Sequence, residues 1–182
     1  MSILDLGITS PADLERQLGI AAPIINEILN DTGLAENNFI KLAQAGYSAK
    51  EIFEVTDEEM ETLFRFGCQS LEAGDLEKAR DVFTKLCQLD GLDSRFPFAL
   101  GGALQLQGSF ALAAKMYLLA LALDAMRVDA YVRVGECLIA AGEDSEAREV
   151  LEIAMSMSGD DDDAVKKQAA ALLKIISARA TA

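Results

Sequence analysis

The chain has 182 residues, of which 51% are apolar, with 16 basic and 30 acidic side chains and a formal net charge of −14. This acidity disfavours DNA or RNA as the main partner, because nucleic-acid binding needs Lys and Arg to neutralise phosphates. The chain contains no histidine, which excludes Ser-His-Asp and Cys-His nucleophile pairs and every zinc site with imidazole ligands. We therefore expect no enzyme, and neither a metal nor another cofactor.

Other totals indicate a soluble helical protein. Only three prolines are present, while Ala, Leu, Glu and Lys abound, and this composition favours an all-α fold. No apolar run reaches the roughly 20 residues that a membrane-spanning helix needs, and no basic, apolar leader opens the sequence. The three cysteines, Cys68, Cys87 and Cys137, have no close pairing, which is typical of reduced thiols in a cytosol. These features predict a cytoplasmic protein without direct membrane insertion.

Residues 1–59 predict an amino-terminal helical segment. Capping-box patterns, in which Ser or Thr is followed three residues on by an acid, begin at Ser10, Ser48 and Thr56. Such patterns mark the first residues of helices, and Gly or Asn-Asp-Thr-Gly breaks separate them. We infer short helices near 11–18, 23–30, 36–45 and 49–54.

Apolar residues in this segment form stripes that must be covered in the folded protein. Packing on the rest of the chain and dimerisation both account for them. We favour a homodimer of the free protein, because apolar stripes on a background of 11 acids and 3 bases are typical of a reversible, charge-limited interface. The residues expected at this interface are Leu14, Leu18, Ile24, Ile25, Ile28 and Leu29.

Residues 60–161 repeat with a period of 34 residues. This is the period of the tetratricopeptide repeat, a helix-turn-helix unit. We therefore predict an all-α fold in which three repeats, residues 60–93, 94–127 and 128–161, form a short superhelical solenoid. The positions that recur are two glycines and an alanine: Gly67, Gly101 and Gly135; Gly74, Gly108 and Gly142; Ala79, Ala113 and Ala147.

Each recurring position has a physical role in such a unit. The first glycine lies within helix A, where it costs about 1 kcal/mol relative to Ala and is tolerated because helices A and B approach closely. The second glycine ends helix A in a left-handed cap. Helix B carries the small Ala and then Phe83 or Tyr117 in the first two units, and we expect these rings to fill the space between one unit and the next.

The segment after the repeats predicts a last helix near 163–178. Asp160 to Asp163 stand at its start, where carboxylates meet free amide donors and the positive end of the helix dipole. A stack of repeats cannot end on an exposed apolar face. We therefore interpret residues 162–182 as a capping helix and tail.

The second repeat also resembles one particular family. Residues 86–90 read Leu-Cys-Gln-Leu-Asp and residues 93–96 read Asp-Ser-Arg-Phe, and a glycine-rich helix with Gln105 and a closing Tyr117 follow. This stretch is similar to the corresponding part of the class II type III secretion chaperones, the cytosolic partners of hydrophobic translocator proteins. The lead-in to the first repeat is similar as well, so the resemblance covers about residues 40–178.

This resemblance implies a chaperone of the bacterial cytoplasm rather than a catalyst. Members of the family keep hydrophobic, membrane-active translocators soluble and secretion-competent, and take an extended client segment into the concave face of the repeats. They often dimerise through their amino-terminal helices, and some also bind a transcriptional activator. The alternative that the sequence leaves open is a regulatory adaptor that docks on such an activator or on a component of the secretion apparatus.

In tetratricopeptide repeats helix A lines the concave face, at the second, fifth, ninth, twelfth and thirteenth positions of each unit. We expect the apolar residues there to grip apolar client residues, Gln105 and Arg95 to bond client backbone, and Gly102 to leave room for a client side chain. Each residue can instead belong to the core, since helix A is packed on both sides. The predicted client-binding groove comprises Phe64, Cys68, Leu71, Arg95, Phe98, Gly102, Gln105, Leu106, Val132, Glu136 and Ile139.

Overall fold

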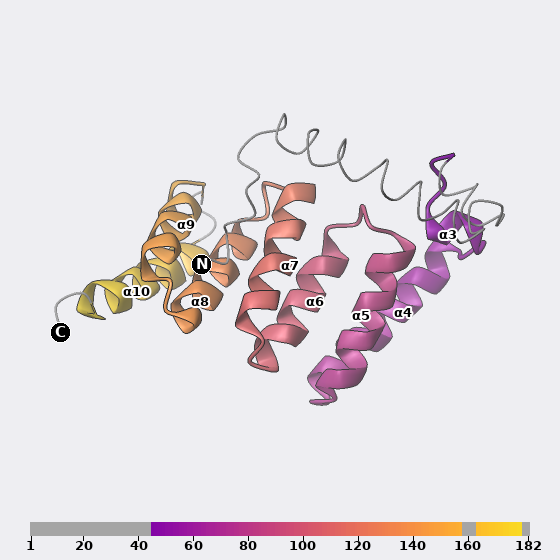
Figure 1. The fold of residues 1–182 in the computed structure, drawn as a ribbon, viewed down its shortest axis with the longest axis horizontal. Coiled ribbons are helices and arrows are strands. Elements are labelled where there is room, and N and C mark those ends of the chain that lie inside the picture. Colours follow the sequence, from indigo (N-terminus) through magenta and orange to yellow (C-terminus); the bar gives the residue numbers. More distant parts are fainter. Residues whose placement is uncertain (1–44, 158–162, 180–182) are drawn as a thin grey trace, which may run out of the picture. The chain divides into compact units, whose positions relative to one another are not determined.

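The computed structural model of the protein describes residues 45–157 and 163–179, and every regular element in these ranges is an α-helix (Figure 1). The chain divides into two compact units between Thr56 and Asp57. The first unit is described only from residue 45 onward and contains the short helix α3 (Ala49–Ile52). Outside the described residues lie the helices expected near 11–18 and 23–30, nearly all of the one near 36–45, and the predicted interface residues Leu14, Leu18, Ile24, Ile25, Ile28 and Leu29.

Helix α3 begins at the predicted capping box. The Ser48 hydroxyl accepts a hydrogen bond from the Glu51 backbone N–H at 3.2 Å, and the Glu51 carboxylate accepts one from the Ser48 backbone N–H at 2.8 Å. The bonds from the Ser48 backbone and side chain hold the pKa of Glu51 below its usual value. The helix ends at Ile52 rather than at 54, because Glu54 adopts a left-handed φ of 54°.

The second unit contains three helical hairpins that follow one another along the chain. Each helix packs on the next, so that the hairpins stack side by side (Figure 1). This arrangement confirms the predicted all-α repeat fold. The first helix begins directly after Thr56, where the sequence shows a capping-box pattern, and so three residues before the repeat boundary expected at residue 60. The hairpins are α4 (Asp57–Glu72) with α5 (Leu76–Leu89), α6 (Arg95–Leu106) with α7 (Phe110–Leu123), and α8 (Val128–Ala141) with α9 (Asp144–Met157).

A glycine in the first helix of each hairpin meets a large side chain of the second. A Cβ on Gly67 would lie 2.6 Å from the Phe83 ring, and one on Gly101 would lie 2.8 Å from the Tyr117 ring. In the third hairpin, Gly135 faces Leu151 in the same way, at 2.6 Å. Phe83 and Tyr117 therefore pack first against the glycine of their own unit, and not only between units as the sequence led us to expect.

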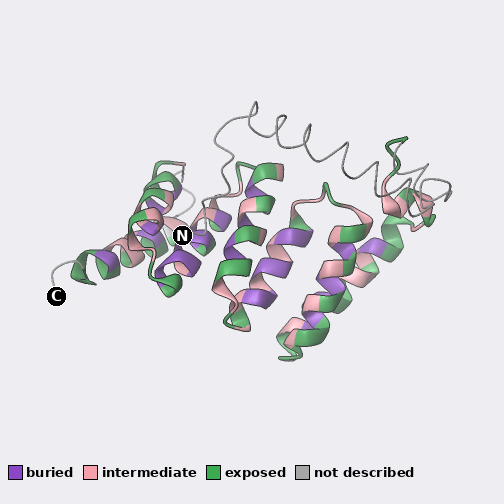
Figure 2. Cartoon of the chain, viewed as in Figure 1, coloured by how far each residue is buried: buried purple, intermediate pink, exposed green. Residues whose placement is uncertain are grey.

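The other two recurring positions behave as predicted. Gly74, Gly108 and Gly142 end the first helices with φ angles of 79°, 77° and 83°, a region that side chains with a Cβ rarely adopt. In the second helices, Ala79, Ala113 and Ala147 are fully buried. Buried residues accordingly follow the helix faces that meet inside the stack, and exposed residues follow the outer faces (Figure 2).

The last helix, α10 (Asp163–Arg179), packs on α9 and α8 and buries Ala169 and Ile176. Its final residue, Arg179, donates a hydrogen bond to the Ile139 carbonyl at 3.1 Å and pairs with Asp144 at 3.1 Å. The helix thus covers the end of the third hairpin, as a capping helix does. Of the acidic run expected before it, residues 160–162 lie outside the described part.

None of the helices in the described ranges combines the length and the apolar character that crossing a membrane requires.

Two adjacent glycines give a matched test of the helix contact. We expect Gly101→Ala to lower the free energy of unfolding by about 1–3 kcal/mol, because the new Cβ would overlap the Tyr117 ring. We expect Gly102→Ala to be neutral or to stabilise by up to about 1 kcal/mol, because its Cβ would meet only the Tyr117 hydroxyl at 3.7 Å and Ala favours the helix. Urea unfolding followed by circular dichroism measures both values, and equal stabilities would contradict the contact.

Candidate functional site

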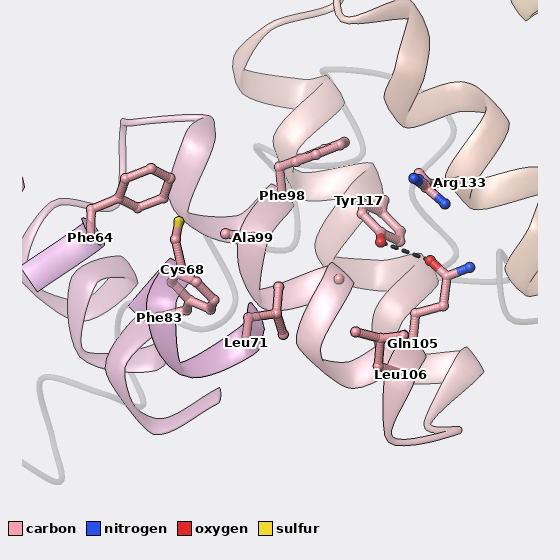
Figure 3. A pocket seen from close by; sticks show the side chains of 11 residues that line it. Phe64, Cys68, Leu71, Phe83, Phe98, Ala99, Gln105, Leu106, Tyr117 and Arg133 are labelled. Atoms are coloured by element: carbon pink, nitrogen blue, oxygen red, sulfur yellow. Dashed lines mark hydrogen bonds between the residues drawn. The ribbon is translucent and has the colours of Figure 1, made fainter. Parts of the chain in front are cut away.

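A cavity of about 430 Å³ opens between α4 and α6, the first helices of the first two hairpins (Figure 3). Helices α5 and α7 contribute buried aromatic side chains to it, and α8 contributes one arginine. A cavity of this size with a mainly apolar lining and few polar groups is typical of a ligand-binding site. The lining residues are Phe64, Cys68, Leu71, Phe83, Phe98, Ala99, Gly102, Gln105, Leu106, Tyr117 and Arg133.

Many residues of the predicted groove line this one cavity. Among them, Leu106 is 64% exposed and stands at the opening. Gly102 leaves open space, since a Cβ there would touch only the Tyr117 hydroxyl. That these residues contact a client stays a prediction. The predicted residues that the cavity brings together are Phe64, Cys68, Leu71, Phe98, Gly102, Gln105 and Leu106.

The remaining predicted groove residues do not line the cavity. Val132 and Ile139 are only 2% and 8% exposed, because α8 is packed against α7, α9 and α10, so they belong to the core of the described structure, and that they contact a client stays a prediction. The guanidinium of Arg95 forms ion pairs with Asp93 at 2.7 Å and with Glu61 at 3.0 Å, away from the cavity lining. Glu136 is hydrogen-bonded to Gln105 and Arg133 of the lining, but does not line the cavity itself.

Sequence reasoning missed four lining residues. Phe83 and Tyr117 were assigned to packing between units, whereas each ring both fills the space beside a glycine and lines the cavity. Ala99 and Arg133 occupy the sixth position of their units. That position lies four residues after the second and three before the ninth, so it shares their helix face, and helical geometry could have identified it.

Phe64, on the α4 side of the cavity, is held between two other rings. Its ring centroid lies 5.9 Å from that of Phe83 and 5.8 Å from that of Phe96, and the Arg95 guanidinium lies 5.3 Å from it. Tilted ring pairs contribute about 0.5–1.5 kcal/mol beyond area burial, and a cation over a ring about 0.5–1 kcal/mol at an exposed site. The ring is therefore positioned before any ligand arrives.

Phe98, on the α6 side, is held in the same manner. Its ring meets the Tyr117 ring edge-on, with centroids 5.3 Å apart, and the Arg127 guanidinium lies 4.4 Å from its centroid. Both aromatic walls are thus supported by neighbouring side chains of the stack, which lowers the entropy lost when a ligand orders them.

A chain of hydrogen bonds runs from the cavity to the capping helix. The Tyr117 hydroxyl donates to Gln105 Oε1 at 2.8 Å (Figure 3), and Gln105 Nε2 donates to Glu136 Oε2 at 2.9 Å. The same Glu136 oxygen accepts from Arg133 Nη1 at 3.0 Å, and its other oxygen accepts from Gln168 Nε2 of α10 at 2.6 Å. Gln105 therefore has its second amide proton left to donate to a client.

Burial acts on titratable groups of the cavity lining and of the helices around it. It raises the pKa of the Tyr117 hydroxyl and of the Cys68 thiol, and Glu72 and Glu61 add to the effect on Cys68. Burial also raises the pKa of Cys87 to about 11 and that of Cys137 to about 12. All three cysteines are free thiols and stay protonated at neutral pH, so none is an activated nucleophile. The described part of the chain holds no cluster of acids and cysteines suited to a metal ion.

Comparison with known proteins extends these observations. The chain is 31% identical over 127 residues to the low calcium response locus protein H of Yersinia pestis. The aligned residues cover 70% of this chain and 74% of that protein. The type III secretion translocator chaperone SycD of Yersinia enterocolitica superposes with a TM-score of 0.66 at 26% identity, over 71% of this chain and 98% of SycD. SycD has also been solved with a peptide of the translocator YopD and as an alternative dimer.

A chain of a type III secretion complex from Aeromonas hydrophila has the same fold, with a TM-score of 0.72 at 24% identity over 78% of this chain and 95% of that chain. No family model matches the sequence. The stacked hairpins and the apolar cavity, taken with these similarities, define a tetratricopeptide-repeat chaperone. The chain belongs to the class II type III secretion chaperones, the translocator chaperones that its second repeat resembles.

The raised thiol pKa values predict slow alkylation of the native protein. At pH 8 the thiolate fraction of a thiol with a pKa of about 12 is on the order of one in ten thousand, whereas that of an ordinary cysteine is roughly a quarter. We therefore expect iodoacetamide to modify Cys137 at least about 100-fold more slowly in the folded protein than in urea. Mass spectrometry of timed samples measures both rates. Equal rates with and without urea would contradict the burial of this thiol.

Proposed function

We propose that this protein binds a hydrophobic translocator of a type III secretion system in the cavity between α4 and α6, and keeps it secretion-competent in the bacterial cytoplasm. The observation that carries the proposal is the apolar cavity itself, about 430 Å³ in volume, with positioned aromatic walls. The relation to SycD supports it, since SycD is known in complex with a translocator peptide.

The cavity would receive apolar side chains of an extended client segment. Phe64, Leu71, Phe98 and Leu106 offer the apolar surface, and each Leu- or Phe-sized side chain buried against them contributes about 1.5–3 kcal/mol. Part of this gain is offset by the translational and side-chain entropy lost on association. Two or three anchoring side chains therefore provide specific but reversible binding, which a chaperone that must release its client needs.

The chemistry of the lining favours this function over a regulatory adaptor. Arg133 is the one ionised side chain among the lining residues, so the cavity offers little to a charged docking segment and much to an apolar one. Its polar groups are mostly satisfied within the protein, which leaves the shape and the apolar surface to determine the fit.

We also propose that the free protein is a homodimer held together by the apolar stripes of its amino-terminal segment. The stripes are apolar at helical spacing while the segment carries mostly acidic charge, which suits a contact that forms and dissociates. The alternative dimer of SycD shows that a relative of this chain self-associates.

Replacing one aromatic wall tests the binding site. We expect Phe98→Glu to weaken translocator binding at least about 30-fold, because a charge in the cavity must be desolvated without a partner. The matched control is Leu112→Glu, which places the same charge on an exposed position of α7 outside the cavity. Affinity purification from the native host, followed by mass spectrometry, identifies the partner, and circular dichroism checks the helices. Unchanged recovery of the translocator with Phe98→Glu would refute the site.

Replacing apolar stripe residues tests the dimer. We expect the wild-type protein to run as a dimer at roughly 100 µM in size-exclusion chromatography with light scattering, and Ile25→Glu with Ile28→Glu to run as a monomer, because buried charges oppose the contact. A wild-type monomer at that concentration would contradict the proposal and leave the cavity's role intact.

A further inference from the structure

The cavity contains one ionised side chain in an otherwise neutral lining. Cys68 and Tyr117 keep their protons, since burial raises the pKa of both, and every other lining residue except Arg133 is uncharged. The whole chain carries a net charge of −14, so its long-range field does not attract acidic segments. A positive group at this place acts by direct contact instead, because mobile ions screen exposed charges beyond about 8–10 Å.

Arg133 has hydrogen-bonding capacity that the protein does not use. Within the described residues its guanidinium donates through Nη1 to Glu136 at 3.0 Å, while its side chain is 46% exposed. A guanidinium carries five N–H donors, so the Nη2 and Nε donors are available at the end of the cavity. The neighbouring Tyr117 hydroxyl proton is already donated to Gln105. Arg133 is therefore the main donor that a client would meet there.

Arg95 is an arginine of the same protein that is equally exposed but binds two carboxylates instead of one. Its guanidinium binds Asp93 at 2.7 Å and Glu61 at 3.0 Å at once, and its side chain is also 46% exposed. Arg133 has one such hydrogen-bonded partner, Glu136, while the Asp129 carboxylate acts on it only through space. Paired, parallel N–H bonds from a guanidinium match the geometry of a carboxylate better than that of an amide.

Glu136 acts as a positioning residue for this arginine. Its carboxylate accepts from Gln105 and from Gln168 as well as from Arg133, so three helices of the stack, α6, α8 and α10, fix its place and share its charge. A carboxylate engaged in this way repels an incoming acid less than a bare one does. It also keeps the guanidinium at the end of the cavity instead of in bulk solvent.

We infer that Arg133 makes the cavity select client segments in which an acidic side chain stands beside the apolar residues that fill it. This inference rests on the proposed function of the cavity and adds the chemistry of one client position. The sixth position of the other two units is Arg65, which does not line the cavity, and Ala99, which has no charge. The selectivity is therefore a property of the third repeat of this chain.

A library of random 12-residue peptides displayed on phage tests the inference without knowledge of the natural client. We expect peptides selected on the full-length protein to combine apolar residues with an Asp or Glu at a constant offset from them. A synthetic peptide of the selected sequence and its twin, with Asn or Gln in place of the acid, are then compared by fluorescence anisotropy. The acidic peptide should bind about tenfold more tightly at low salt, and the preference should shrink as salt is raised.

The variants separate this inference from the proposed function. In Arg133→Gln the ratio of the two affinities should fall from about ten to about one, whereas the control Arg65→Gln, at the same position of the first repeat, should leave the ratio unchanged. Selected peptides without acids, or an affinity ratio that Arg133→Gln does not alter, would overturn the role of Arg133. If Phe98→Glu still weakened peptide binding in that case, the proposed function of the cavity would stand. Peptide binding that Phe98→Glu does not weaken, or no selected peptide at all, would overturn both.

Discussion

The fold depends on a contact between a glycine of one helix and a large side chain of the next. In the first two hairpins the ring of Phe83 or Tyr117 lies where a Cβ would otherwise stand, and Leu151 takes that place in the third. The two helices of a hairpin can therefore approach closely, and their alanines are fully buried between them. Because the contact recurs at one spacing, the hairpins have the same geometry and stack regularly. The cavity between α4 and α6 is a result of that stacking.

Much of this architecture follows from the sequence, because the constraint that shapes it is periodic. The glycines at 67, 101 and 135 and the left-handed turns at 74, 108 and 142 predicted the hairpins to within a few residues. The first helix starts three residues before the repeat frame, directly after the Thr56 of a capping-box pattern, so this start follows from a local signal and not from the period. The residues of α4 and α6 that line the cavity, apart from Ala99, were predicted because helix A faces inward in every such repeat.

What the sequence did not reveal depends on contacts between distant residues. Val132 and Ile139 stand at groove positions, yet α8 has a capping helix on it where α4 and α6 have an open face, and no local pattern reports that difference. Arg95 was expected to meet a client, but two carboxylates, one of them 34 residues away, already bind it. Tyr117 and Phe83 were assigned one role each, although a ring has two faces and an edge, and here more than one of these is in contact.

The double role of Tyr117 has a consequence for the lifetime of the protein. The same ring fills the space beside Gly101 and lines the cavity, so a ligand that packs on it also restrains the hairpin that it holds together. A ligand that binds only the folded state raises the free energy of unfolding in proportion to the logarithm of its concentration. Proteases act on the small unfolded fraction, so the loaded chaperone is degraded more slowly than the empty one.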